Sequence, residues 1–296
     1  MKATKRLREL LAGDEIVVLP GAYDGLTARL VEQAGFPGVY MTGAGTAASY
    51  GYPDYGLITM TEMTEKAAVL ARSVKIPVIA DADTGYGNEL NVTRAVREFE
   101  ARGIAGIHIE DQVSPKRCGH LDGKEIVPLD VFVANIRAAV QAKSDPDFLI
   151  IARSDARAVA GLDEAIDRVN AALTAGADMA FVEAPCTMDE VATIPQRVAG
   201  PCLLNMVPAG RTPLVTTQEA QEMGFRMVLY PGIMLVAQIT AGAEALRTLR
   251  DTKKAPTVPL TAQVMQAFQV LGAAEWDELR SGFQSVAQAS SARRGT

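Results

Sequence analysis

Short apolar runs recur along the chain, and several of them follow a helical stretch that ends in a glycine. The four runs of this kind cover residues 38–41, 106–109, 179–182 and 227–230. A glycine just past the end of a helix takes the left-handed conformation and turns the chain into the next strand. The pattern therefore predicts four helix-to-strand joints, at Gly35, Gly103, Gly176 and Gly224.

Four further apolar runs lie between these, at residues 16–19, 78–80, 148–152 and 202–204. Runs that are short and continuously apolar are typical of parallel strands buried on both faces. The intervals between them are long enough for a helix, and eight such units in 296 residues favour a closed (β/α)8 barrel of the TIM type over an open sheet. No G-x-G-x-x-G motif follows the first strand, which counts against a dinucleotide-binding fold.

The region beyond Thr240 reads as further helices whose apolar content exceeds what the surface of a barrel needs. We predict one barrel domain over residues 1–296. Within it, residues 241–285 form a helical region that packs against a neighbouring subunit. Residues 288–296 are expected to form a flexible tail.

Composition narrows the class of partner. A formal net charge of −6 and an aromatic content of 5% argue against nucleic acid. No apolar stretch approaches the roughly 20 residues of a membrane span, and no signal-type segment follows the N-terminus. The three cysteines have no ligand-like spacing, so neither a disulfide framework nor a zinc site is indicated. We expect a cytoplasmic protein.

Polar residues stand at or just beyond the ends of six consecutive predicted strands. They are Thr42, Asp81 with Asp83, Glu110, Arg153, Glu183 and Asn205. Barrel enzymes build their sites at the carboxyl ends of the strands, because the loops there vary while the barrel holds their ends. The pattern predicts a functional site at this rim.

Two motifs suggest its chemistry. Residues 115–120 combine Lys116, Cys118 and His120 around a glycine. These side chains are typical of a mobile loop that closes over an anionic substrate and exchanges protons with it. The i, i+2 spacing of Asp81 and Asp83 puts both carboxylates on one side of an extended backbone, where they either bind a metal or cap the next helix. Together the motifs indicate metal-assisted carbon chemistry on a small acid.

Seven segments resemble the isocitrate lyase and phosphoenolpyruvate mutase superfamily: residues 40–45, 81–88, 108–112, 116–120, 152–156, 182–185 and 205–206. The cysteine loop is similar to that of the lyase branch, which includes methylisocitrate and 2,3-dimethylmalate lyases. The resemblance implies a bound Mg²⁺ or Mn²⁺ and a homotetramer that exchanges its last helix. It also implies cleavage of a 2-hydroxy di- or tricarboxylate into pyruvate or another α-keto acid and a carboxylic acid.

The resemblance also assigns roles. Asp83 becomes the direct metal ligand, with Asp81, Glu110 and Asp54 acting through waters. Cys118 becomes the acid that protonates the carbanionic product, with His120 and Lys116 as its catalytic neighbours on the loop. The sequence leaves open whether the cations nearby or the carboxylates decide the charge of the Cys118 thiol.

The remaining residues would bind substrate. The expected set is Thr42, Gly43, Ala44, Gly119, Arg153, Glu183 and Asn205. Arg153 would pair with the carboxylate next to the reacting carbon, although a structural salt bridge with Glu183 or Asp155 is an alternative. Tyr40 would take the proton of the substrate hydroxyl, with a metal-activated group and a purely packing role as the competing interpretations.

One stretch departs from the family. Residues 230–236 are wholly apolar, and Val236 aligns where methylisocitrate lyases have an arginine for the distal carboxylate. A dicarboxylate with an alkyl substituent is therefore favoured over a tricarboxylate. Oxaloacetate hydrolysis or decarboxylation on the same scaffold is the first rival. A phosphonate mutase and a non-catalytic metabolite-binding barrel are less favoured.

Overall fold

The structure, a computed structural model, describes residues 1–257 and 264–294, with side chains described as far as Gln284. The chain divides into two compact units, Met1–Ile239 and Thr240–Thr296.

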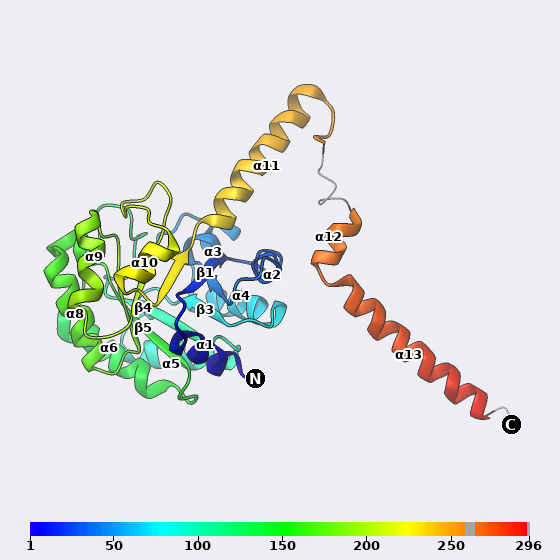
Figure 1. Ribbon diagram of the computed structural model, residues 1–296, viewed down its shortest axis with the longest axis horizontal. Coiled ribbons are helices and arrows are strands. Elements are labelled where there is room, and N and C mark those ends of the chain that lie inside the picture. Colours follow the sequence, from blue (N-terminus) through cyan, green and yellow to red (C-terminus); the bar gives the residue numbers. More distant parts are fainter. Residues whose placement is uncertain (258–263, 295–296) are drawn as a thin grey trace. The chain divides into compact units, whose positions relative to one another are not determined.

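The first unit is a closed barrel of eight parallel strands (Figure 1). Each strand pairs with the next one along the chain, and β8 closes the barrel against β1, with Pro20 opposite Tyr230. The strands are β1 (Val17–Ala22), β2 (Val39–Met41), β3 (Val78–Asp81), β4 (Gly106–Glu110), β5 (Leu149–Ser154), β6 (Met179–Val182), β7 (Cys202–Asn205) and β8 (Met227–Tyr230). All eight predicted strands are present, and the predicted (β/α)8 fold is confirmed.

Helices lie before and between the strands. They are α1 (Ala3–Ala12), α2 (Gly25–Gln33), α3 (Gly43–Ser49), α4 (Met60–Ser73), α5 (Glu89–Ala101), α6 (Leu129–Ala142), α7 (Arg157–Ala160), α8 (Leu162–Thr174), α9 (Met188–Arg197) and α10 (Thr217–Met223). The four glycines predicted at the helix-to-strand joints all have φ between 82° and 107°. This is the left-handed region, so the joints form as expected. Capping boxes begin α4 at Thr59 and α10 at Thr216, where the side chain of a glutamate three residues on accepts from the capping residue's N–H.

Strand β4 shows how the barrel separates core from site. Ile107 and Ile109 point outward into the layer between strands and helices. His108 and Glu110 alternate with them and are buried on the inner side. The period of two along a strand thus carries polar side chains into the barrel, where only other polar groups near its mouth can satisfy them.

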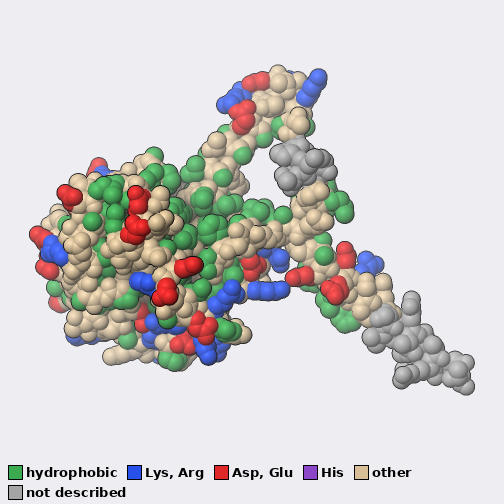
Figure 2. All heavy atoms as spheres, viewed as in Figure 1, with side chains coloured by type: hydrophobic (Ala, Val, Ile, Leu, Met, Phe, Trp, Pro, Cys, Tyr) green, Lys and Arg blue, Asp and Glu red, His purple; other side chains and the backbone are tan. Residues whose placement is uncertain are grey.

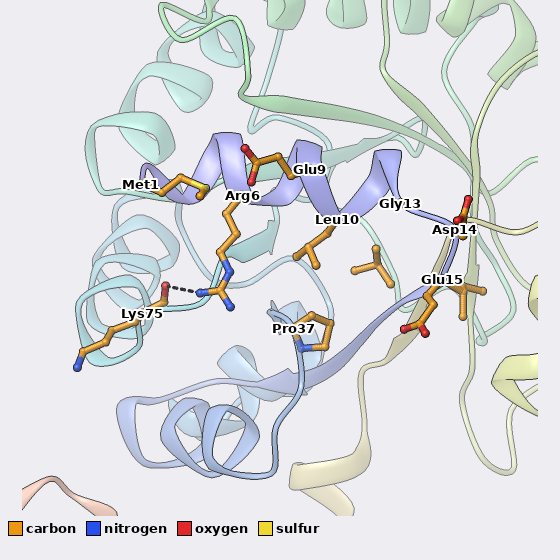
Figure 3. A pocket seen from close by; sticks show the side chains of 11 residues that line it. Met1, Arg6, Glu9, Leu10, Gly13, Asp14, Glu15, Pro37 and Lys75 are labelled. Atoms are coloured by element: carbon orange, nitrogen blue, oxygen red, sulfur yellow. Dashed lines mark hydrogen bonds between the residues drawn. The ribbon is translucent and has the colours of Figure 1, made fainter.

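Helix α1 covers the amino end of the barrel. Leu7 is fully buried and joins the cluster that fills the barrel interior. An open groove runs between this helix and the loops that enter β1, β2 and β3, and Arg6 there donates a hydrogen bond to the carbonyl of Lys75 over 3.4 Å (Figure 3). It lies at the opposite end of the strands from the predicted rim.

The second unit is helical in its described parts. Helix α11 (Ile233–Thr252) begins in the first unit, and α12 (Val264–Val270) and α13 (Ala273–Arg294) follow. Large apolar side chains are exposed along these helices, among them Phe268, Trp276 and Phe283. Hydrophobic side chains are green in Figure 2. The flexible tail is predicted over residues 288–296. The side chains of all these residues, and residues 295–296 entirely, lie outside the described part of the structure. Among the described residues, no helix is both long and apolar enough to cross a membrane.

Candidate active site

A cavity of about 230 Å³ opens at the carboxyl ends of the strands, within the first unit. We call it the rim cavity. Its lining consists of Tyr40, Thr42, Ala44, Asp54, Asp81, Cys118, Gly119, His120, Arg153, Glu183, Asn205, Val207, Pro231, Gly232 and Leu235. Polar groups from separate strands therefore face one volume, together with an apolar wall.

The two aspartates after β3 are held by their backbone. Asp83 has φ of 47°, an uncommon value for a residue other than glycine, and its N–H donates to Asp81 Oδ1 over 2.9 Å. Gly43 packs so closely on the Asp81 carboxylate that a β-carbon there would collide with it. Strain and close packing of this kind gather at functional sites.

Lys116 reaches into this carboxylate cluster from the loop. Its ammonium lies 2.9 Å from Asp83 Oδ1 and 2.6 Å from Asp54 Oδ1, and the side chain is buried. Burial alone would lower the pKa of Lys116, but Asp83, Asp81 and Asp54 outweigh it and raise that pKa well above its ordinary value. A fully charged lysine therefore neutralises part of the negative charge of the rim.

The donor set suits a cation that keeps its waters. Among the described residues, no group of three or more His, Cys, Asp or Glu side chains converges closely enough to hold a metal directly. Mg²⁺ needs only one or two carboxylates, since water completes its shell. Glu110 Oε1 and the Tyr86 hydroxyl are buried without a hydrogen-bond partner, which is the kind of oxygen that a hydrated ion would satisfy. The residues present fit Mg²⁺ or Mn²⁺ at Asp83.

Arg153 is fixed from two sides. Its Nε and Nη2 donate to Asp155 over 2.9 and 3.2 Å, and Nη1 lies 3.2 Å from Glu110 Oε2. The Asp155 carboxylate lies beside Asp111, which accepts from the Asp155 N–H and from Ser154. The structural salt bridge to Asp155 considered from the sequence is therefore present, and the guanidinium still lines the cavity. A planar cation held in this way is pre-organised for a carboxylate.

Glu183 connects the loop of residues 111–125, which we call the catalytic loop after its predicted role, to Asn205 at the end of β7. Its Oε1 lies 3.0 Å from His120 Nε2, and Asn205 donates to both carboxylate oxygens over 3.3 and 3.2 Å. Burial raises the pKa of Glu183, but Arg153 and His120 outweigh it and bring that pKa to about 2. Glu183 is a charged acceptor that holds the loop histidine and Asn205 in place.

Tyr40 and His108 form a buried pair. The Tyr40 hydroxyl lies 2.9 Å from His108 Nε2, while Nδ1 faces Asp81 Oδ1 at 3.7 Å. The negative Asp81 favours the tautomer with the proton on Nδ1, so that Tyr40 donates to Nε2. Burial lowers the pKa of His108 to about 4, which leaves the ring neutral and able to accept. Burial and Asp81 raise the pKa of Tyr40 well above its ordinary value, so the phenol is protonated.

The state of the Cys118 thiol, which the sequence left open, follows from its surroundings. Burial raises the pKa of Cys118, and the carboxylates of Asp54 and Glu183 add to this effect against an N–H bond from His120 and the charge of Arg153. The thiol is protonated at neutral pH and can act as an acid.

Comparison with known proteins shows which family this chain belongs to. Residues 7–250 match the model of the phosphoenolpyruvate phosphomutase family, and these residues carry the whole barrel. The chain belongs to this family. It is 45% identical over 252 residues to the 2,3-dimethylmalate lyase of Eubacterium barkeri, covering 85% of this chain and 87% of the relative. It is 44% identical over 248 residues to a probable 2-methylisocitrate lyase of Corynebacterium glutamicum, covering 84% and 81%.

A solved structure is similar over almost the full length. It is an oxaloacetate acetylhydrolase in complex with the inhibitor 3,3-difluorooxalacetate, with a TM-score of 0.93 and 40% identity, covering 96% of this chain and 97% of that one. The family fold and the order of its elements are therefore shared with proteins named as lyases and as a hydrolase.

In this protein, all but four of the residues predicted for the site line the rim cavity. The four others are Gly43, Asp83, Glu110 and Lys116, each of which contacts a lining residue: Asp81 for Gly43 and Asp83, Arg153 for Glu110, and Asp54 for Lys116. Val236 lies outside the cavity and is 60% exposed, whereas Leu235 lines it. The alignment put Val236 at the position of the family's arginine, and in the structure its neighbour Leu235, in the first turn of α11, is the residue that lines the cavity.

Sequence reasoning missed two contributors, Val207 and Lys124. Val207 forms the apolar wall with Pro231 and Leu235, which belong to the apolar stretch 230–236 noted from the sequence. Lys124 is buried beneath the loop, where its Nζ donates to the Gly119 carbonyl. Position alone could have indicated Val207, since it follows Asn205 by two residues. Nothing local marks Lys124 apart from other lysines.

Proposed function

We propose that this protein is a metal-dependent carbon–carbon lyase that cleaves a 2-hydroxy alkyldicarboxylate, of the 2,3-dimethylmalate type, into pyruvate or another α-keto acid and a carboxylic acid. The observation that carries the proposal is a protonated Cys118 thiol facing the same small cavity as Arg153, Glu183 and Asn205. Acid, carboxylate-binding cation and polar rim are the parts that such a cleavage needs.

Asp83 would hold a Mg²⁺ or Mn²⁺ ion, with Asp81, Glu110 and Asp54 reaching it through waters. When bound, the ion would supply Lewis-acid polarisation of the substrate hydroxyl and its neighbouring carboxylate. Lys116, already paired with Asp83 and Asp54, would share the negative charge of this cluster.

The residues of the chain carry the protons. The Tyr40 oxygen would take the hydroxyl proton of the substrate as its own proton moves to the neutral His108 Nε2, 2.9 Å away. The electron pair that the departing proton leaves on the oxygen forms the new C=O bond, and the carbon–carbon bond breaks. Its electrons pass into the carboxylate of the leaving fragment and give an aci-carboxylate, a dianionic enediolate.

Cys118 completes the reaction. Its S–H proton goes to the carbon of the aci-carboxylate, whose electron pair forms the new C–H bond and restores an ordinary carboxylate. When the products leave, the thiolate regains a proton and His108 gives up the one it received, so no net proton is gained or lost and both groups return to their starting states. Arg153 would hold the carboxylate beside the reacting carbon, and Thr42, Gly43 and Ala44 would offer backbone N–H groups. Gly119 would allow the loop to lie close to the substrate.

The apolar wall sets the substrate class. Val207, Pro231 and Leu235 carry no charge or hydrogen-bonding side chain, so this side of the cavity suits an alkyl substituent. A third carboxylate placed there would be buried without a cation, at a cost of roughly several kcal/mol. Leu235→Arg should therefore improve turnover of 2-methylisocitrate relative to 2,3-dimethylmalate. The exposed Val236→Arg is the matched control and should leave that ratio unchanged.

The direct test of the proposal is product identity. Purified protein is incubated with 2,3-dimethylmalate, 2-methylisocitrate and oxaloacetate, with Mg²⁺ and with a chelator in parallel. Metal-dependent release of pyruvate from the alkylmalate is expected. Oxalate and acetate from oxaloacetate as the main products would instead establish a hydrolase, the second candidate, which the similarity to the acetylhydrolase structure favours.

The proposal extends to assembly and location. Exposed apolar side chains on α11, α12 and α13 support packing of the C-terminal helices on a second copy of the chain, in a homotetramer. Light scattering after size-exclusion chromatography should give about four times the 31.4 kDa of one chain. The three free thiols support a reducing cytoplasm as the place of work.

A further inference from the structure

The catalytic loop is held over the rim cavity by contacts of several kinds. At its start, the Gln112 side chain bonds both the N–H and the carbonyl of Arg117, over 3.0 and 2.8 Å. At its end, Val113 and Glu125 share a backbone hydrogen bond of 2.8 Å. These contacts tie the two ends of the loop to each other. They leave the position of its tip, at residues 118–122, to other partners.

Arg211, in the loop between β7 and α10, contacts this tip three times. Its backbone N–H donates to His120 Nδ1 over 3.1 Å, and its Nε donates to the His120 carbonyl over 3.1 Å. Its Nη2 also pairs with Asp122. Gly210 packs against the same imidazole, so closely that a β-carbon there would stand 2.8 Å from Nδ1. Backbone and side chain of one short segment therefore enclose His120.

The backbone contact decides how the ring is oriented. Because Nδ1 accepts the Arg211 N–H, the proton of the neutral ring lies on Nε2, which is the atom 3.0 Å from Glu183 Oε1. The other neutral tautomer, with its proton on Nδ1, would set two donors against each other at that atom. His120 thus presents a donor to Glu183 only while Arg211 is in place.

We propose that Arg211 is a positioning residue that latches the tip of the catalytic loop in the closed position and so sets the orientation of His120 and the place of Cys118 over the substrate. The loop that carries Arg211 follows Asn205, the last residue of β7, and includes Val207; both residues line the cavity. The latch therefore connects loop closure to the segment that holds one end of the substrate. Only the turnover readout of this inference rests on the proposed function.

The guanidinium is the part of the latch that substitution can remove. Arg211→Met retains the backbone N–H and the bulk but loses the bonds to the His120 carbonyl and to Asp122. Loss of these partly exposed hydrogen bonds should shift the loop toward open forms by roughly five- to tenfold. Arg211→Lys keeps the charge but cannot reach both acceptors in the same geometry, so it should fall between the two.

The test measures the rate of Cys118 alkylation by iodoacetamide in the substrate-free protein, with peptide mass spectrometry to separate the three cysteines. In Arg211→Met we expect alkylation of Cys118 to accelerate about five- to tenfold, whereas kcat/KM should fall by a smaller factor because the closed form still predominates. Removing a positive charge by itself would disfavour the reactive thiolate and slow alkylation. Faster reaction therefore reports an open loop.

Two controls separate a latch from general loosening. Cys186, whose thiol contacts the Ala184 carbonyl away from the loop, serves as the reference within the same molecule. Asp122→Asn keeps both contacts of Arg211 to His120 and loses an ion pair whose Asp122 side chain is 90% exposed, so it should stay within about twofold of wild type.

An unchanged Cys118 rate in Arg211→Met would overturn the proposal, as would an equal acceleration of Cys118 and Cys186. Because alkylation needs no substrate, this outcome is independent of whether the wild-type protein turns over an alkylmalate. A wild-type protein with no lyase turnover but with the expected alkylation pattern would refute the proposed function and leave the latch standing.

Discussion

Replacing Cys118 with serine tests the assignment on which the reaction depends. Serine keeps the shape of the side chain and a hydrogen-bonding group, but its hydroxyl is a far weaker acid than the thiol. Positioned proton transfer contributes typically 10²- to 10⁴-fold to a rate. At about 1.4 kcal/mol for each tenfold change, this corresponds to roughly 3 to 5 kcal/mol of the barrel's transition-state stabilisation. We therefore expect Cys118→Ser to lose about 10²-fold or more in kcat while it still binds pyruvate.

The pH dependence adds a second readout. The working form of Cys118 is the protonated thiol, which persists below its pKa. Burial and the nearby Asp54 and Glu183 raise that pKa above its ordinary value of 9.0. In the cleavage direction, the alkaline decline of wild-type activity caused by this group should therefore have its midpoint above pH 9. Cys118→Ser should lack that decline.

The assay is pyruvate release from 2,3-dimethylmalate, coupled to lactate dehydrogenase, with pyruvate binding followed by calorimetry. Cys186→Ser is the matched control, because Cys186 lies outside the rim cavity and uses its backbone N–H to bond Glu190. A Cys118→Ser rate close to that of the control, or an alkaline decline that survives the substitution, would refute the acid assignment.

Three further predictions concern the rim. Gly43→Ala should weaken Mg²⁺ binding at least about tenfold by calorimetry, because the new β-carbon displaces Asp81; Gly242→Ala, which meets nothing within 4 Å, should not. Asp83→Asn should lower Mg²⁺ affinity by at least about tenfold, and unchanged affinity would remove it as the ligand. The depressed pKa of Glu183, about 2 against an ordinary 4.5, gives stability that is present above pH 4.5 and lost as pH falls toward 2. Between pH 6 and pH 3, wild type should therefore lose about 2 kcal/mol more unfolding free energy in urea than Glu183→Gln, and equal losses would contradict the coupling.

Several parts of the molecule followed from local sequence pattern. The eight apolar runs became strands close to their predicted bounds, since a parallel strand buried on both faces must be apolar over its whole length. The alternation around His108 placed it inside the barrel with Glu110, because side chains on a strand change faces at every residue. The polar residues after the strands met at one rim, because parallel strands end on the same side of a barrel.

Other features needed the closed barrel. Leu235 rather than Val236 lines the cavity, because the exact start of α11 decides which side chain turns inward. His120 Nδ1 accepts a hydrogen bond from Arg211, which lies 91 positions further along the chain, and no local pattern marks that arginine. The protonation of Cys118 depended on a balance of burial against charges from Asp54, Glu183 and Arg153, which come from separate loops and strands.

The sequence by itself determined the strands, the joints between helix and strand, and the kinds of side chain at the rim. These depend on neighbours in the chain, on burial period and on the turn preference of glycine. Tertiary structure decided which side chains share the cavity, which charges they feel and what holds the loop. Those depend on distances between segments remote in sequence, and such distances exist only once the barrel has closed.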